Sequence, residues 1–303
     1  MKPPVYDADW PEEVQALYRH DVQEMWDRSI APHIWNQYHN QLDTYLKIAG
    51  TESKEILDVG CAQGTLALLL AERGHHVTAV DLRPGFLDYA RARHTHGEVR
   101  FLAANVLEDD LPGNYDLIYA NQIVEHLVYP EQLLARLLAR LKPGGRLVMT
   151  TPNGDYVKNQ LPSFRQLGDV RNWEYRQHTA DGDGHFYSYL DSELVQLFEG
   201  VGFAEVQASF FESPMISGHM KIRHVHAIVP PVMLRVLDQL VVHAPWLGRR
   251  LTHQLMVTGV RPLLMRHIEV STPFGLSLAK PIHPSTSPGR TGFKLHLAGS
   301  TGT

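Results

Sequence analysis

The stretch Glu55-Ile-Leu-Asp-Val-Gly-Cys-Ala-Gln-Gly-Thr65, followed by His76-Val-Thr-Ala-Val-Asp81, decides the fold of this chain. It predicts a buried strand, a glycine turn, a helix and a second strand that ends in a carboxylate. In a parallel α/β sheet this order places the turn and Asp81 side by side at the carboxyl ends of neighbouring strands, where an acid can bind ribose hydroxyls. The sequence therefore predicts a nucleoside site anchored by Asp81.

The spacing of the glycines indicates which nucleoside is bound. A dinucleotide-binding turn has the pattern G-x-G-x-x-G, in which the third glycine lets the helix pack close to the strand. Counted from Gly60, this chain has Ala62, Gly64 and Thr65, which fits that pattern poorly. A nicotinamide oxidoreductase is therefore a disfavoured alternative, which titration with NAD would test.

The pattern D-x-G-x-x-x-G from Asp58 to Gly64 instead resembles motif I of the class I S-adenosylmethionine-dependent methyltransferases. Further along, Tyr115-Asp-Leu-Ile-Tyr-Ala-Asn-Gln-Ile-Val-Glu-His-Leu127 resembles the fourth strand of that family and its Glu-His turn. Leu141-Lys-Pro-Gly-Gly-Arg-Leu-Val-Met-Thr-Thr-Pro-Asn153 resembles its fifth strand. The resemblance covers roughly residues 50–262 and is closest to ubiquinone-biosynthesis O-methyltransferases and related small-molecule and sugar methyltransferases. It implies an α/β fold with a Rossmann-like seven-stranded sheet whose last strand is antiparallel, and helices on both faces.

The resemblance also implies S-adenosyl-L-methionine as cofactor and assigns its contacts. The glycines would let the backbone approach the methionine moiety and ribose, Asp81 would bind both ribose hydroxyls, and Leu82 would cover the adenine. Two departures from the family pattern are Ala62, where a glycine is usual, and Asn105, where an acid often contacts the adenine amine. An amide carries both donors and an acceptor, so it can still hydrogen-bond the adenine edge. The expected cofactor-binding residues are Asp58, Gly60, Cys61, Ala62, Gly64, Asp81, Leu82, Asn105, Val106, Asn121, Gln122 and Tyr38.

Three histidines are candidates for a general base. Methyl transfer to a hydroxyl requires loss of a proton, and a neutral imidazole has a suitable pKa. His185, just before a predicted helix, matches the position of a histidine in ubiquinone-type O-methyltransferases, although it could equally order its loop. His126, after the fourth strand, and His178 are weaker candidates. No metal is expected: Asp181 and Asp183 with His178 and His185 could bind a divalent ion, but their flanking glycines favour a polar loop.

The chain divides into three predicted parts. Residues 1–49 form an N-terminal helical lid in which Tyr38 and His39 are of interest, residues 50–262 form the methyltransferase domain, and residues 263–303 form a Ser-, Thr-, Gly- and Pro-rich tail expected to be disordered. Insertions at 154–190 and 212–250 are expected on the substrate side. Strands are predicted at 55–59, 76–80, 98–103, 115–120, 145–151, 203–211 and 255–260, and helices at 64–73, 85–93, 130–141 and 191–199, the last ending at Gly200.

The insertion at 212–250 carries an unusual helix. Between Ser213 and Arg250, five basic residues face one acid, a local charge of 5 − 1 = +4 in a chain of net charge −5. Pro231 opens a predicted helix that is apolar around most of its circumference. Such a helix either packs between the sheet and a neighbouring subunit, as in a homodimer, or lies in a membrane interface with its basic flanks near anionic head groups. The sequence leaves both alternatives open. The residues of the narrow polar stripe are Arg235, Asp238, Gln239 and His243.

Composition and net charge limit the classes of function that fit this chain. The chain has 303 residues, 44% of them hydrophobic, and its net charge of −5 without a basic run argues against a nucleic-acid partner. The only cysteine is Cys61, and no signal peptide or membrane-spanning segment is expected, which favours a cytoplasmic protein that at most contacts the inner face of the membrane. We expect methyl transfer to a hydroxyl of a small molecule, a sugar or a lipid-linked acceptor. The alternatives are a nitrogen or carbon acceptor, or a catalytically silent cofactor-binding subunit.

Overall fold

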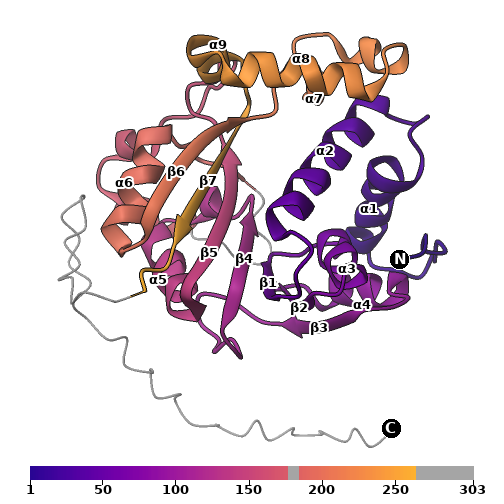
Figure 1. The fold of residues 1–303 in the computed structure, drawn as a ribbon, viewed down its shortest axis with the longest axis horizontal. Coiled ribbons are helices and arrows are strands. Elements are labelled where there is room, and N and C mark those ends of the chain that lie inside the picture. The colour runs from indigo at the N-terminus through magenta and orange to yellow at the C-terminus, as the bar shows by residue number, and fades with distance from the viewer. Residues whose placement is uncertain (177–183, 264–303) are drawn as a thin grey trace, which may run out of the picture.

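One mixed sheet forms the centre of the molecule (Figure 1). The computed structural model describes residues 1–176 and 184–263. The seven strands of the described part have the order β3-β2-β1-β4-β5-β7-β6, and β7 is antiparallel to both of its neighbours. The predicted fold is confirmed, including the antiparallel last strand. The strands are β1 (Glu55–Val59), β2 (His76–Asp81), β3 (Glu98–Ala103), β4 (Tyr115–Asn121), β5 (Leu141–Pro152), β6 (Ala204–Phe211) and β7 (Gln254–Val260).

Helices cover both faces of the sheet because alternate strand residues point to opposite sides. Leu57 and Ile118 face one core with α5 and α6, whereas Ile56 and Tyr119 face a second core with α2 and α3. The longer helices are α1 (Glu12–Asp21), α2 (Pro32–Ala49), α3 (Thr65–Glu72), α4 (Pro84–Arg93), α5 (Pro130–Arg140), α6 (Asp191–Val201) and α8 (Pro231–His243). The shorter ones are η1 (Val22–Trp26), η2 (Val124–His126), η3 (Phe164–Leu167), η4 (Val170–Arg176), α7 (Pro214–Ser217), η5 (Arg223–Ala227) and α9 (Pro245–Leu251).

Two predicted boundaries are wrong, and both errors concern glycines. The Pro-Gly-Gly segment at 143–145 was expected to separate α5 from the fifth strand, but β5 begins at Leu141, which pairs with Tyr115 before the register shifts. Helix α6 continues past Gly200 to Val201, and Gly202, with φ of 110°, ends it. A glycine stops a helix where the backbone enters the left-handed region, and its presence in the sequence does not fix that point.

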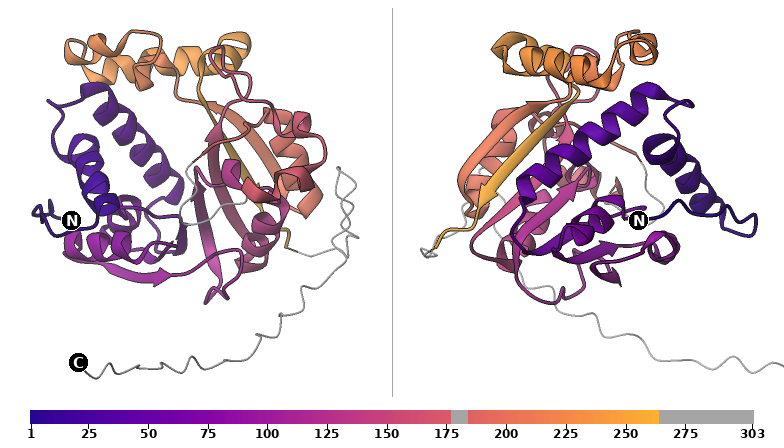
Figure 2. Two further views of the ribbon diagram at one scale, coloured as in Figure 1. Left: turned by 180° about the vertical axis from the view of Figure 1, so that it is seen from behind. Right: turned by 45° about the vertical axis from the view of Figure 1, so that its right-hand side comes forward.

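The segment α7–α9 lies across one end of the sheet (Figure 1). It follows β6, which runs in the same direction as β5, so this is the edge at which the parallel strands end. Helix α2 of the predicted lid contacts α7 and η5 at this end. The views in Figure 2 show α8 and α9 on the outside of the molecule, beyond the ends of α2 and β6. No helix in the described part of the chain is long and apolar enough to cross a membrane.

Candidate functional site

Three alternate residues of the turn between β1 and α3 have backbone conformations in the left-handed region. Gly60, Ala62 and Gly64 have φ of 66°, 45° and 73°. A Cβ on Gly60 would lie 2.9 Å from Cδ1 of Ile123, and one on Gly64 would lie 2.7 Å from Cβ of Ala90. At Gly64 both packing and backbone conformation require glycine, whereas at Gly60 the end of the Ile123 side chain could move and the positive φ is what favours glycine. Ala62 occupies the position where the family usually has glycine, and it adopts the backbone conformation that glycine would adopt without strain.

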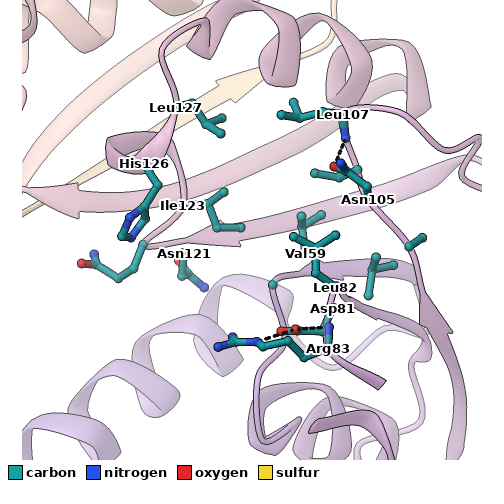
Figure 3. Close-up of a pocket in the computed structure, with 15 residues that line it drawn as sticks. Val59, Asp81, Leu82, Arg83, Asn105, Leu107, Asn121, Ile123, His126 and Leu127 are labelled. Atoms are coloured by element: carbon teal, nitrogen blue, oxygen red, sulfur yellow. Dashed lines mark hydrogen bonds and ion pairs between the residues drawn. The ribbon is translucent and has the colours of Figure 1, made fainter. Parts of the chain in front are cut away.

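A cavity of about 170 Å³ lies beside this turn, at the ends of β1, β2 and β4 (Figure 3). Asp81 and Arg83 lie at one end of it and Asn105 and Leu107 at another. Its remaining walls are largely apolar. The lining residues are Val59, Gly60, Val80, Asp81, Leu82, Arg83, Ala104, Asn105, Val106, Leu107, Asn121, Gln122, Ile123, His126 and Leu127.

Asp81 is held in a fixed orientation. The residue is only 4% exposed, and its Oδ2 accepts a hydrogen bond of 3.0 Å from the backbone N–H of Ala62. Its Oδ1 accepts from the backbone N–H of Arg83 at 3.0 Å and from Nε of Arg83 at 3.2 Å. These bonds fix the direction of the carboxylate and leave it lone pairs for a ligand. Asn105 has a similar local bond: its Oδ1 accepts from the N–H of Leu107 at 3.0 Å, so its amide NH₂ remains to donate.

A second cavity, of about 350 Å³, lies between the same turn and the N-terminal helices. The two cavities share Gly60, Asn121 and Gln122, so they meet at the turn and at the end of β4. The walls of the second cavity combine apolar surface with several polar side chains. Its lining residues are Leu17, His20, Glu24, Tyr38, Gln41, Leu42, Tyr45, Asp58, Gly60, Cys61, Ala62, Gln63, Leu66, Asn121, Gln122 and Thr150.

Glu24 gives this second cavity an acid that the sequence analysis did not single out. It lies in η1, a π-helical turn, and its Oε2 accepts a hydrogen bond of 2.8 Å from Nε2 of Gln63. The same nitrogen contacts the hydroxyl of Tyr38 at 3.0 Å. Burial raises the pKa of Glu24 to about 7 and that of Asp58 to about 7. π-helical turns frequently occur at functional sites, but no sequence pattern indicates this one.

His185 and His126 come together with a buried acid. Their ring centroids are 4.7 Å apart, and Nε2 of His185 lies 3.7 Å from Oε1 of Glu125. Glu125 is fully buried, its Oε2 accepts from the hydroxyl of Thr151 at 3.1 Å, and burial raises its pKa to about 8. The side chain of His185 is 38% exposed, and its partial burial lowers its pKa, which favours the neutral imidazole at neutral pH.

Tyr187 explains why the segment that contains His185 lies here. This tyrosine is completely buried, and its hydroxyl lies 2.6 Å from the carbonyl oxygen of Val124 and 2.7 Å from that of Leu127. Phe186 packs beside it and stacks on Trp173, with ring centroids 5.7 Å apart. The aromatic residues of the 154–190 insertion therefore fix His185 against the η2 turn.

The predicted residues can now be placed. All the expected cofactor-binding residues except Gly64 line one or both cavities, and Gly64 instead packs against α4. His39 stacks on Trp35 with ring centroids 3.8 Å apart and is not among the lining residues. His178, Asp181 and Asp183 lie outside the described residues, as does the predicted tail from residue 264.

Glu125, His126 and His185 form a further group with metal-binding potential. Each offers one ligand atom, and the three atoms lie within 4.8 Å of one another. One carboxylate and two imidazoles suit a divalent transition metal. This set differs from the one weighed from the sequence, because the burial of Glu125 beneath His185 cannot be inferred from spacing.

Comparisons with known proteins agree with this geometry. A family model for a methyltransferase domain matches residues 12–208, more than half of the chain. A ubiquinone biosynthesis O-methyltransferase of Idiomarina loihiensis is 32% identical over 128 residues, which cover 41% of this chain and 52% of that protein. An uncharacterised methyltransferase of Mycobacterium bovis is 35% identical over 131 residues, 42% of this chain and 65% of that protein. The chain thus spans about half the length of the curated relatives it matches.

Solved structures show the same fold. Phosphoethanolamine N-methyltransferase 2 of Haemonchus contortus, in complex with phosphomonomethylethanolamine and S-adenosylhomocysteine, is similar with a TM-score of 0.52 and 18% identity. The match covers 82% of this chain and 57% of that one. An S-adenosylmethionine-dependent methyltransferase of Mesorhizobium loti gives a TM-score of 0.51 at 19% identity, over 75% of this chain and 98% of that one.

Proposed function

Because this chain belongs to the class I S-adenosylmethionine-dependent methyltransferases, we propose that it transfers a methyl group to a hydroxyl oxygen of a small-molecule, sugar or lipid-linked acceptor. The observation that carries the proposal is His185, a histidine whose pKa is lowered by burial, held over the buried Glu125 beside the turn that follows β4. Similarity to ubiquinone biosynthesis O-methyltransferases supports oxygen as the acceptor atom.

The residues around the two cavities fit S-adenosylmethionine. Asp81 offers a buried, oriented carboxylate for the two ribose hydroxyls, and Leu82, Val106 and the amide of Asn105 provide an apolar wall and a donor for an adenine. Gly60, Asn121 and Gln122 border both cavities, so a methionine moiety would pass them. When bound, the cofactor supplies an electrophilic methyl group.

The chain itself would orient the acceptor and take its proton. Methyl transfer is an in-line displacement at the methyl carbon, so much of the rate comes from holding the acceptor oxygen in place. Tyr38, Gln41 and Gln63 in the wall of the second cavity are polar side chains suited to this. We assign proton acceptance to Nδ1 of His185, because Nε2 is the ring nitrogen that faces Glu125. Burial raises the pKa of the Glu125 carboxyl group to about 8, but an imidazolium 3.7 Å away would favour its ionised form, which in turn would stabilise the imidazolium.

The experiment compares His185→Gln with wild type, using S-adenosylmethionine with a labelled methyl group and a panel of phenols, dihydroxybenzenes and glycosides as acceptors. Loss of a general base lowers turnover by about 100- to 10,000-fold. Affinity for S-adenosylhomocysteine, measured by calorimetry, should not change. His185 must be neutral to accept a proton, and burial lowers its pKa. In wild type, the turnover rate should therefore rise with pH in the range below pH 6.5.

Two results would redirect the assignment. If His185→Gln kept wild-type turnover, the base role would pass to His126 or His178, or the acceptor would be an amine or carbon that needs no base. Loss of turnover in EDTA with recovery on adding Mg²⁺ or Zn²⁺ would make His185 a ligand of the Glu125–His126–His185 group. Binding of S-adenosylhomocysteine without turnover of any acceptor would favour a silent cofactor-binding subunit.

A further inference from the structure

Helix α8 exposes most of its apolar side chains. Val232, Val236 and Leu240 recur every four residues and are 70%, 62% and 67% exposed. Trp246 on the following helix α9 is 73% exposed. Isolated exposed apolar residues are common, but a contiguous set of this size marks a binding surface. We call this surface the α8 face. Its members are Ile228, Val232, Met233, Val236, Leu237, Leu240, Trp246 and Leu247.

The orientation of α8 is fixed by polar contacts on its inner side. Leu234 and Asp238 are the buried residues of the helix, and Oδ1 of Asp238 accepts a hydrogen bond of 2.7 Å from the N–H of Ser213. Arg235 pairs with Asp43 of α2 at 2.5 Å. Part of the polar stripe therefore faces the protein, so the apolar side of the helix is held outward.

Basic residues flank the α8 face at both ends. Lys221 and Arg223 precede α8, and Arg250 lies in the last turn of α9; all three are exposed. Within the described residues, none of these three has an acidic partner within ion-pair distance, whereas Arg235 and Arg249 are paired. The charge of the flanks is therefore available to a partner, although the whole chain has a net charge of −5.

A second copy of the chain fits this surface poorly. A two-fold dimer through α8 would bring basic flanks of the two copies against each other, since both ends of the face carry cations. Like charges facing each other across an interface are costly. An anionic surface satisfies both flanks at once. A tryptophan beside the basic end is also typical of a membrane–water interface, where its ring remains at head-group level.

We propose that the α8 face lies in the surface of an anionic lipid bilayer, with Val232, Val236 and Leu240 in the acyl boundary and Lys221, Arg223 and Arg250 at the phosphates. The helix then binds the interface without crossing the membrane. This proposal does not depend on which atom the enzyme methylates, because it concerns only the outer surface of α8 and α9.

The surface is linked to the second cavity. Gln41 lines that cavity, and its Nε2 donates to Oε2 of Glu212 at 2.9 Å. Glu212 directly follows β6 and precedes Ser213, whose N–H bonds to Asp238 of α8. The bilayer-facing helix is therefore two hydrogen bonds from the cavity wall, and an acceptor drawn from the membrane would approach from this end of the sheet.

The test is sedimentation of the full chain with vesicles of phosphatidylcholine and phosphatidylglycerol, and with vesicles of phosphatidylcholine alone, at low and high NaCl. We expect binding to the anionic vesicles only, and weaker binding at high salt because exposed charges are screened. Val236→Glu with Leu240→Glu should reduce the vesicle partition coefficient by about 10-fold or more, since two inserted apolar side chains become anionic. Val5→Glu is the matched control, because Val5 is 87% exposed but belongs to the N-terminal segment.

A second measurement detects membrane contact in the wild-type protein, so it does not depend on whether the glutamate variants fold. In wild type, lipids brominated on their acyl chains should quench the fluorescence of Trp246, and Trp246→Phe should remove this quenching. Absence of binding to anionic vesicles at low salt would overturn the proposal, as would equal binding to phosphatidylcholine alone. A dimer in sedimentation velocity that Val236→Glu with Leu240→Glu converts to monomer, without vesicle binding by wild type, would assign the face to a second copy.

Discussion

At the scale of single residues, Ala62 and Asp81 act as a pair. Ala62 is in the left-handed region at φ of 45°, a conformation that costs an alanine more than a glycine. That conformation directs its N–H to Oδ2 of Asp81. Strained backbone persists where its surroundings hold it in place and is common at binding sites. Ala62 therefore replaces the usual glycine without losing the contact that orients the carboxylate.

Asp81→Ala should weaken the binding of S-adenosylhomocysteine by tens to hundreds of fold. Loss of two charge-assisted hydrogen bonds to ribose hydroxyls corresponds to roughly 2–4 kcal/mol. Isothermal calorimetry on the purified variant measures this directly. Asp88→Ala is the control, because Asp88 is an exposed acid paired with Arg91 on α4 and should leave affinity unchanged. Near-wild-type affinity in Asp81→Ala would count against the placement of the ribose.

At the scale of elements, the N-terminal helices are tied to the cofactor turn by one buried arginine. Arg93 at the end of α4 pairs with Asp21 of α1 at 2.9 Å, and both side chains are inaccessible to solvent. Arg93 also donates to the carbonyl of Gln63 at 2.6 Å and to the hydroxyl of Thr65 at 2.9 Å. Burial raises the pKa of Asp21 despite the adjacent guanidinium, so the pair is costly to bury and its value lies in fixing the N-terminal helices.

Arg93→Met should lower the free energy of unfolding by about 3–5 kcal/mol, because it leaves the buried Asp21 without its cation. Amide hydrogen exchange should quicken most in α1 and η1, the elements that lose this link. Chemical denaturation and exchange measured by mass spectrometry report the two effects separately. Arg91→Met, two residues earlier on an exposed pair, should change neither. Unaltered exchange in α1 and η1 would show that other contacts hold these helices.

Helix α8 shows what a pattern can and cannot predict. Pro231 marks its first residue, and the structure starts the helix there and ends it at His243. Its orientation was not predictable, because apolar residues occupy most of the circumference and either side could have been buried. The inward turn of Asp238 depends on a single backbone N–H, that of Ser213, which no periodicity reveals.

At the scale of the whole molecule, the sheet could be predicted from the sequence, but the burial of individual acidic side chains could not. Apolar runs bounded by glycine turns indicate strands locally, and the resemblance to a family supplies their order. Glu125 and Glu212 are buried by contacts with segments 60 and about 170 residues away in the sequence, His185 in one case and Gln37 and Gln41 in the other. Contacts of that separation leave no local signal, so the chemistry of the site could be predicted only down to candidate side chains.

The buried groups together predict an unusual dependence of stability on pH. Burial raises the pKa of Glu125 and of Glu212 to about 8, and such carboxyl groups stabilise the fold below their unfolded pKa and lose that contribution as the pH rises through the folded value. Burial lowers the pKa of His253 to about 3 and that of His226 to about 4, so their contribution is instead lost as the pH falls below about 6.5. The two effects oppose each other between about pH 4.5 and 6.5, and above that only the carboxyl groups titrate.

We therefore expect the ligand-free protein to be most stable on the acid side of neutrality and to lose stability between about pH 6.5 and 8. Urea denaturation across this range measures the slope. Glu212→Gln should make the slope shallower, because the amide does not titrate and can still accept from Gln37 and Gln41 of α2. Glu98→Gln, an exposed acid on β3, is the control and should keep the wild-type slope. If Glu212→Gln also kept it, the Glu212 carboxyl group would have to ionise at an ordinary pKa despite its burial, and its contacts with the amides of Gln37, Asn40 and Gln41 would have to be strong enough to hold a buried charge.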